Sequence, residues 1–237
     1  MSGLPIPLII VAGIALVAVV GYVAYLAWLA EKKRREALAA LASRLGWSFD
    51  PSRDRHHDDE YAHFEIFRRG HSRVAHNTLT GQLEINDLQW PAKMGDFRYK
   101  VTSHSGKSTT TRTYRFSYLI LHMPYARVPD LLLRREGMFD KIAGALGFDD
   151  IDFESAEFSR RFHVKSADKR FAYDVVHPRM MEFLLAGDAP TVDIENKRCC
   201  LSDGRRRWQP EQFEQKLAWL RQFLDLWPDH VITTLKG

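Results

Sequence analysis

LIIVAGIALVAVVGYVAYLAWLA, residues 8–30, is a run of 23 residues without a charged side chain. A helix of this length is about 34 Å long, which is enough to cross a hydrocarbon layer of about 30 Å with some tilt. Tyr22, Tyr25 and Trp28 stand near its end, and aromatic rings of this kind suit the headgroup level of a bilayer. The stretch therefore predicts an N-terminal transmembrane anchor within residues 1–30.

Four basic residues, Lys32, Lys33, Arg34 and Arg35, follow this stretch directly. Together with Trp28 they are the predicted membrane-interface residues, and the positive-inside rule predicts that the chain after them is cytoplasmic. We therefore expect a single-pass protein of the plasma (inner) membrane with its N-terminus outside.

A cleaved signal peptide is the main alternative for this stretch, and its pattern does not fit. Residues 1–7 contain no Lys or Arg, and charged residues stand where a cleavage site would be expected. The apolar run is also longer than the 7–15 residues of a signal peptide. A core helix of a soluble protein rarely has this length without a polar face. The sequence therefore predicts an anchor that is retained.

The remaining chain is mildly basic, since residues 31–237 carry the whole net charge of +4 and the sequence pI is about 9.1. Such a charge suits a surface close to anionic lipid but is too small to predict a nucleic-acid partner. The two cysteines, Cys199 and Cys200, are adjacent and would face opposite sides of a strand. Two thiols without a disulfide framework fit a reducing compartment.

Residues 31–46 read as a juxtamembrane helix, with Leu38, Leu41, Ala42 and Leu45 on one face and Gly46 at its end. Its role stays open between resting on lipid and packing onto the following domain. Residues 47–237 are predicted to form one soluble α+β domain of antiparallel strands and packed helices. A soft boundary near residues 124–130 would divide it into lobes 47–126 and 127–237.

The first lobe is predicted to be rich in strands. Residues 64–67, 74–79 and 83–85 read as a meander of short strands, with turns at residues 69–70 and 80–81. The polar run PSRDRHHDDE, residues 51–60, reads as an exposed loop or a short solvated helix. A metal site at its adjacent His56 and His57 is the less favoured interpretation, because neighbouring side chains on an extended chain face apart.

The segment SGKST, residues 105–109, resembles the end of a phosphate-binding loop. That loop needs a glycine at the position of Val101 and a helix directly after the segment. Here alternating strands lie on both sides, so we predict a β-hairpin.

The second lobe contains the candidate site residues. A helix is predicted around Phe139 to Leu146, and a strand after it would place Asp150, Asp152 and Glu154 on one side. Carboxylates so placed can bind Mg²⁺ or act as acid and base, although a solvated strand edge is the favoured interpretation.

Two histidines follow in the same lobe. His163 falls in a strand predicted over residues 158–164, and Asp168 is predicted to cap the next helix. His177 precedes Pro178 and is predicted to cap or pack rather than act as a base. Residues 191–208 read as a hairpin around residues 202–204, and residues 213–227 as a final amphipathic helix.

Several segments together resemble a bacterial family of membrane-anchored proteins of unknown function. They are the strand at Phe97 to Tyr99 with its Ser-Gly-Lys hairpin, residues 148–153, residues 157–164 and the helical residues 171–185. The resemblance implies an α+β domain and a bacterial origin. It brings no activity, catalytic residue or cofactor with it.

The favoured function is a non-enzymatic interaction or sensory domain that is tethered to the membrane and binds a protein partner. One alternative is a membrane-anchored hydrolase that uses Asp150, Asp152, Glu154, His163 or His177. The sequence has no HExxH motif, and Gly70-His71-Ser72 lacks the second glycine of a nucleophile elbow. Another alternative is an anionic-lipid-binding module with basic residues at 32–35, 160–161 and 205–207. No catalytic, cofactor-binding or metal-binding residue is predicted.

Overall fold

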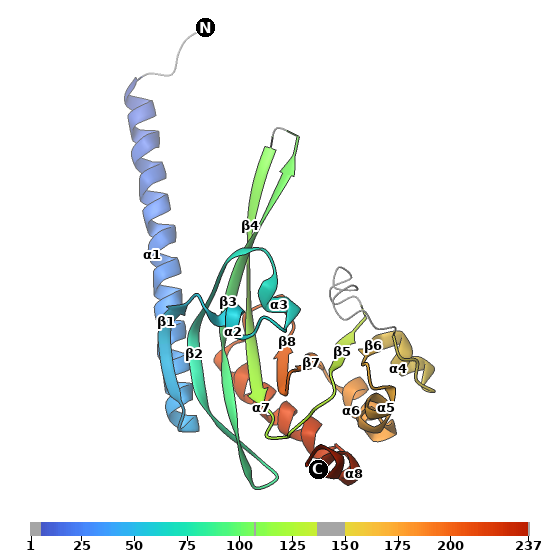
Figure 1. The fold of residues 1–237 in the computed structure, drawn as a ribbon. Coiled ribbons are helices and arrows are strands. Elements are labelled where there is room, and N and C mark those ends of the chain that lie inside the picture. The colour runs from blue at the N-terminus through green and yellow to red at the C-terminus, as the bar shows by residue number, and fades with distance from the viewer. Residues whose placement is uncertain (1–5, 107, 137–149, 237) are drawn as a thin grey trace.

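The structure is a computed structural model that describes residues 6–106, 108–136 and 150–236. It has an α+β fold in which one long N-terminal helix leads into an eight-stranded antiparallel sheet with helices on both faces (Figure 1). This confirms the predicted fold class. The strand order is β1-β2-β3-β4-β8-β7-β5-β6.

The strands and helices have the following bounds. The strands are β1 Ser48–Asp54, β2 His71–Ile85, β3 Leu88–Ser105, β4 Ser108–His122, β5 Leu131–Arg135, β6 Phe162–Lys165, β7 Thr191–Glu195 and β8 Arg198–Ser202. The helices are α1 Ile6–Leu45, α2 His57–Glu60, α3 Glu65–Arg68, α4 Ala156–Arg161, α5 Lys169–Val175, α6 Pro178–Ala186, α7 Pro210–Asp225 and α8 Asp229–Lys236.

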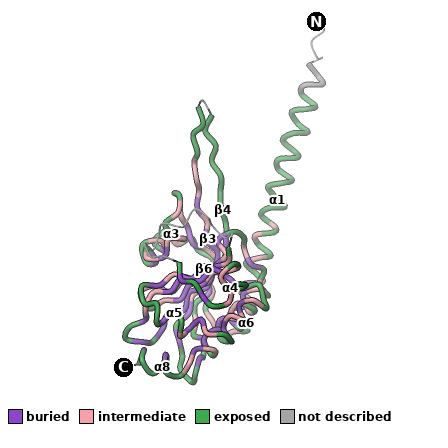
Figure 2. The backbone as a smooth tube through the Cα atoms, turned by 90° about the vertical axis from the view of Figure 1, so that its right-hand side faces the viewer, coloured by how far each residue is buried: buried purple, intermediate pink, exposed green. Residues whose placement is uncertain are grey.

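Helix α1 joins the predicted anchor and the predicted juxtamembrane helix into one element of 40 residues. Its N-terminal part is long and apolar enough to span a membrane and is not buried within the protein, as Figure 2 shows. Near its other end Leu38, Leu41 and Ala42 are buried in the core. Gly46 ends the helix in the left-handed conformation, with φ 68°, as predicted. Packing onto the domain, and not lipid, is therefore the role of this apolar face.

The sheet has a core on each face. The larger core lies between the sheet and helices α1, α5, α6, α7 and α8. The smaller core lies under α2 and α3 and is mainly aromatic. Cys199 belongs to the first core and Cys200 to the second, which confirms that these neighbours face opposite sides of a strand.

The predicted hairpin at SGKST is confirmed, because β3 and β4 pair from Ser105 with Ser108 down to Ala92 with Leu121. Two other turns were predicted at wrong places. Strand β2 runs straight through residues 80–81, where the ring of Trp47 lies so close to Gly81 that a Cβ atom would meet it at 2.3 Å. The β7–β8 hairpin turns at residues 196–197, both with positive φ, and not at residues 202–204.

Three further predictions of secondary structure differ from the structure, and two elements were not predicted. Residues 65–67 lie in helix α3 and residues 158–161 in helix α4, where strands were predicted, whereas residues 162–164 form β6 as predicted. Residues 150–154 are not a strand, although Ile151 and Phe153 are buried as the alternation suggested. Strand β5 and helix α8 were not predicted. The helix predicted around Phe139 to Leu146 lies outside the described residues.

Candidate functional site

The point where the membrane helix meets the sheet is a buried polar cluster around Arg34. Its guanidinium binds both carboxylate oxygens of Asp96, with Nε–Oδ2 at 2.7 Å and Nη2–Oδ1 at 2.6 Å. It also donates from Nη1 to the carbonyl of Trp208 at 2.8 Å. The side chain of Arg34 is 9% exposed and that of Asp96 is fully buried. Arg34 therefore belongs to the protein body, whereas Lys32, Lys33 and Arg35 are exposed.

Strands β2 and β4 complete the pairing of Asp96. Ser117 donates from Oγ to Asp96 Oδ1 at 2.7 Å, and Asn77 donates from Nδ2 to Asp96 Oδ2 at 3.1 Å. Asn77 lies at an irregularity of the β2–β3 register with φ 54°, and bulges of this kind re-aim side chains. All close partners of Asp96 are hydrogen-bond donors, so its side chain joins α1, β2 and β4.

Glu31 and Arg207 extend the cluster toward the membrane. Arg207 donates from Nη1 to Glu31 Oε2 at 2.8 Å, and Asn77 donates to Glu31 Oε1 at 3.1 Å. Burial alone would raise the pKa of Glu31, but these two hydrogen bonds outweigh it and lower the pKa to about 2. The charged and polar contacts of the cluster attach α1 to the sheet.

The hydrolase alternative required the candidate carboxylates and histidines to converge. One pair makes direct contact, and a second pair, Glu154 and His177, shares a cleft. His163 Nδ1 lies 2.8 Å from Asp150 Oδ2, and His163 Nε2 contacts the carboxylate of Glu136. Lys165 lies 3.9 Å from Asp150. Both imidazole nitrogens thus contact carboxylates. The arrangement is an exposed ion-pair network at the edge strand β6.

The other candidates lie elsewhere. Glu154 and His177 line a cleft of about 530 Å³ between residues 153–155 and helices α5 and α6. His177 donates from Nε2 to the carbonyl of Leu226 at 2.9 Å, so its ring is fixed at the start of α6. Asp152 is exposed, and its carbonyl accepts a hydrogen bond from the Tyr173 hydroxyl. Among the described residues, no group of three or more His, Cys, Asp or Glu side chains is placed to bind a metal ion.

Residues 51–60 were predicted as an exposed loop or a short solvated helix; residues 51–54 belong to β1 and residues 57–60 form the short helix α2, but His57 is not solvated. Helix α2 turns its ring into the smaller core, where it is 0% exposed. The rings of Tyr61, Phe67 and Tyr118 lie 4.6–4.7 Å from it, between centroids. Burial lowers its pKa to about 2, so His57 is a neutral packed ring.

The predicted basic clusters do not share one face. Arg207 lies beside α1 through Glu31, whereas Arg160 and Arg161 belong to α4 at the opposite end of the sheet (Figure 1). A basic group that the sequence analysis missed lies closer to α1. Arg98 and Arg115 are directly opposite in the β3–β4 ladder, and burial, followed by the charges of Arg53, Arg115 and Arg55, lowers the pKa of Arg98.

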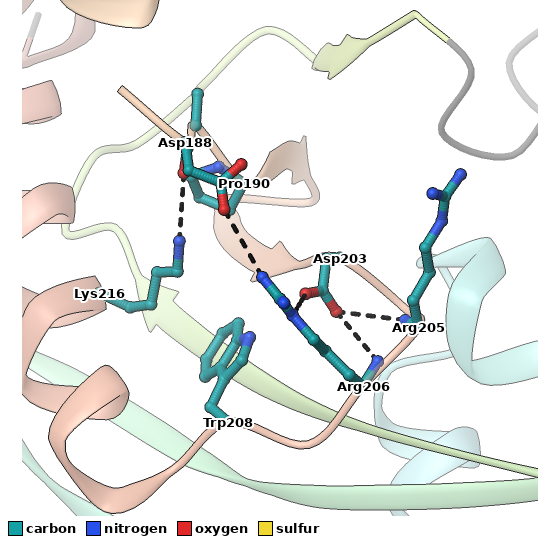
Figure 3. Close-up of a pocket in the computed structure, with 8 residues that line it drawn as sticks. Asp188, Pro190, Asp203, Arg205, Arg206, Trp208 and Lys216 are labelled. Atoms are coloured by element: carbon teal, nitrogen blue, oxygen red, sulfur yellow. Dashed lines mark hydrogen bonds and ion pairs between the residues drawn. The ribbon is translucent and has the colours of Figure 1, made fainter. Parts of the chain in front are cut away.

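A pocket of about 280 Å³ lies next to the cluster, between the segments before β7 and after β8 and helix α7 (Figure 3). Asp203 accepts from the backbone N–H groups of Arg205 and Arg206 and contacts Arg206 Nε at 3.4 Å. Asp188 lies 3.6 Å from Arg206 Nη2. Trp208 forms part of the wall.

Asp96, Asn77 and Ser117 were not predicted as site residues. One signal for Asp96 was an interruption of the apolar alternation along β3. Asp96 follows Ala92 and Met94 on the same face of the strand, where an apolar residue is expected.

No protein-family profile matches the chain, and no curated protein is similar to it. Among solved structures, the crystal structure of the mycobacterial trehalose monomycolate transport factor A, TtfA, is similar with a TM-score of 0.51 and 13% sequence identity. The match covers 84% of this chain and 96% of that one. At this identity the likeness shows a shared fold. The resemblance to a bacterial family of membrane-anchored proteins remains a prediction.

Proposed function

We propose that this chain is a single-pass, non-enzymatic accessory protein that binds an integral membrane protein through its outer hairpin, residues 102–111. The body would lie on the cytoplasmic side, as the basic residues after α1 predict. The structural neighbour is named as a transport factor, which supports an accessory role beside a membrane transport protein. The observation that carries the proposal is the position of the outer hairpin relative to α1.

The orientation of the body follows that of α1. Between Tyr22 and Leu45 the helix contains no Gly or Pro, the residues at which helices usually kink. The buried pair of Arg34 with Asp96 and the buried face of α1 fix its C-terminal half to the sheet. The body therefore tilts together with the membrane span.

The outer hairpin rises past the level at which α1 enters the membrane. From Asp96, which contacts Arg34, strand β3 continues for about 30 Å to Ser105, whereas α1 rises only about 6 Å from Arg34 to Ala30. Figures 1 and 2 both show the described part of the hairpin on the same side of the body as the apolar part of α1 and level with that part. Along the hairpin from Asp96 toward its end, Arg98 and Arg115 are met first, near the headgroup level, and the outer hairpin lies beyond them.

Lipid is an unsuitable environment for the outer hairpin. Its sequence, TSHSGKSTTT, contains no apolar side chain. Beyond the β2 partner of Lys100, β3 and β4 pair only with each other among the described residues, so neither outer edge has a strand partner in that part of the chain. Each backbone group without a hydrogen-bond partner costs several kcal/mol in hydrocarbon. A polar surface of a membrane protein can supply the missing hydrogen bonds, and an acidic one would complement the basic arginines.

Accessibility of a single introduced thiol tests this proposal. The native cysteines are buried, at 0% and 2% exposed, so a cysteine at the exposed Thr110 is labelled against little background. The full-length Thr110→Cys protein, in the membranes of its native host, should react slowly with a membrane-impermeant maleimide and faster after detergent extraction. Thr233→Cys on α8, far from the membrane span, is the matched control and should react equally in both states.

A photocrosslinker attached to Thr110→Cys identifies what covers the hairpin. The expected result is a discrete adduct with an integral membrane protein. Equal and fast labelling in membranes and in detergent would mean that the hairpin lies in water, and adducts with lipid alone would place it in the bilayer. Either outcome refutes the proposal.

A further inference from the structure

Four arginines gather on the face of the sheet to which α1 is attached. Arg98 of β3 pairs with Arg115 of β4, two positions beyond Asp96. Every second residue of a strand returns to the same face, so both side chains lie on the face of Asp96. Arg53 of β1 joins this face through the register of β1, β2 and β3, and Arg55 follows two positions later. We call Arg53, Arg55, Arg98 and Arg115 the arginine cluster.

The arginine cluster has no acidic partner within the described part of the chain. None of its four guanidinium groups forms a hydrogen bond or ion pair with a described residue, and Asp96 on the same face is already bound by Arg34. Burial lowers the pKa of Arg98, and the charges of the other three arginines lower it further, so the four cations are close enough to repel one another. Three of them are exposed and Arg98 is partly buried, so an anion from outside can reach them.

The arginine cluster lies at the level where the apolar part of α1 ends. From Asp96, strand β3 advances about 7 Å to Arg98. From Arg34, which contacts Asp96, α1 rises about 6 Å to Ala30, the last residue of the apolar stretch. Both elements advance in the same direction (Figures 1 and 2). The polar headgroup region begins where the hydrocarbon layer ends, so lipid phosphates lie at the depth of the cluster.

We infer that the arginine cluster binds the phosphate groups of anionic membrane lipids beside α1. A planar guanidinium donates two parallel hydrogen bonds to a phosphate, and the charge of the lipid offsets the repulsion among the four cations. Lipid is favoured over an acidic protein surface, because phosphates surround a lipid-embedded span at this depth and the cytoplasmic leaflet is anionic. The inference rests on the membrane span of α1 and not on the partner of the outer hairpin.

Thermal unfolding of the full-length protein in a nonionic detergent, with added phosphatidylglycerol or phosphatidylcholine, tests this inference. Phosphatidylglycerol should raise the melting temperature saturably. Phosphatidylcholine, whose phosphate is balanced by a quaternary ammonium group, should raise it much less. Arg98→Gln combined with Arg115→Gln should weaken the apparent affinity for phosphatidylglycerol about 30-fold, which corresponds to about 2 kcal/mol for two basic residues.

Arg179→Gln combined with Arg221→Gln is the matched control. These exposed arginines belong to α6 and α7, on the side of the body away from the apolar part of α1 (Figure 1). The control loses the same two charges and should bind phosphatidylglycerol like the parent. An equal weakening in both double variants would mean that net charge, and not the arginine cluster, attracts the lipid, and would overturn the inference.

Native mass spectrometry of the same three proteins gives a readout that does not depend on their stability. The parent and the control should retain more phosphatidylglycerol than the variant without Arg98 and Arg115. Equal retention by all three would mean that the lipid binds elsewhere. A melting shift of the same size with inorganic phosphate would indicate a site for a soluble anion. No response to phosphatidylglycerol would leave an acidic protein surface as the complement of the cluster, and each of these three results overturns the inference.

Discussion

Asp96 is the residue on which the attachment of α1 depends. Its carboxylate accepts from Arg34, Asn77 and Ser117, and all three lose this hydrogen bond in Asp96→Ala. Removing one partner of a buried ion pair costs about 3–5 kcal/mol, because the other charge stays buried. We expect a loss of this size in the free energy of unfolding of the full-length protein, measured in urea by tryptophan fluorescence.

An exposed ion pair of α1 is the control for this prediction. Glu214→Ala removes the pair of Arg44 with Glu214, whose side chains are 57% and 41% exposed, and should cost less than about 1 kcal/mol. In the double variant Arg34→Met with Asp96→Leu no charge is left unpaired, so its loss should be smaller than the sum of the single losses. A cost of Asp96→Ala no larger than that of Glu214→Ala would contradict the assignment.

Glu195 makes stability depend on pH. Burial, and then the charge of Asp130, raises its pKa from 4.5 to about 7. The folded protein therefore holds this proton more tightly than the unfolded chain, and the free energy of unfolding falls as pH rises from about 4.5 to about 7. Glu195→Gln should be more stable than the parent at about pH 8. The gain should be only about 1 kcal/mol, because the side chain is partly solvated.

Melting temperatures at two pH values check this prediction. The stabilisation by Glu195→Gln should vanish at about pH 4, where the parent side chain is protonated in both states. Glu211→Gln, at an exposed position of α7, should change little at either pH. A gain of equal size at both pH values would mean that it does not arise from ionisation.

At the scale of elements, the stiffness of α1 should decide where the outer hairpin lies. Leu29→Gly combined with Ala30→Gly introduces a flexible pair at the membrane boundary, where helices with such pairs kink. The hairpin can then leave the membrane layer. In this background the labelling of Thr110→Cys in native membranes should approach the rate in detergent. Leu29→Ala, which keeps helix propensity, should leave the labelling slow, and slow labelling in the double-glycine protein would refute this role of α1.

The elements that the sequence predicted well are those whose signal is local. The apolar span, the SGKST hairpin and the helix that begins at Pro210 each carry their pattern within one segment. Asp168 caps α5 by accepting from the N–H of Phe171, as predicted. The prediction was wrong at residues 65–68, because their apolar pair belongs to a short helix and not to a strand. In a segment of four residues the apolar pattern cannot distinguish a helix from a strand.

At the scale of the molecule, the polar cluster could not be predicted because it is built from distant segments. Arg34 and Trp208 are 174 residues apart, and Asp96, Asn77 and Ser117 stand singly in strands. The Asp150 to Glu154 group was singled out because its carboxylates are close in sequence, yet the fold divides it between β6 and the cleft beside His177. Their spacing along the chain suggested a shared site, but the fold does not bring the three carboxylates together.

The structure assigns different positions to the four basic residues that follow the span. Lys32, Lys33 and Arg35 are exposed and are free to determine topology, whereas Arg34 is bound to Asp96. We expect external protease to spare the body in spheroplasts and to digest it in inverted vesicles. Replacing Lys32, Lys33 and Arg35 by Gln should increase the misoriented fraction without lowering the melting temperature, because orientation follows the basic residues that flank a span. Arg34→Gln should lower the melting temperature without increasing the misoriented fraction. A misoriented fraction that rises only with Arg34→Gln would contradict these separate roles.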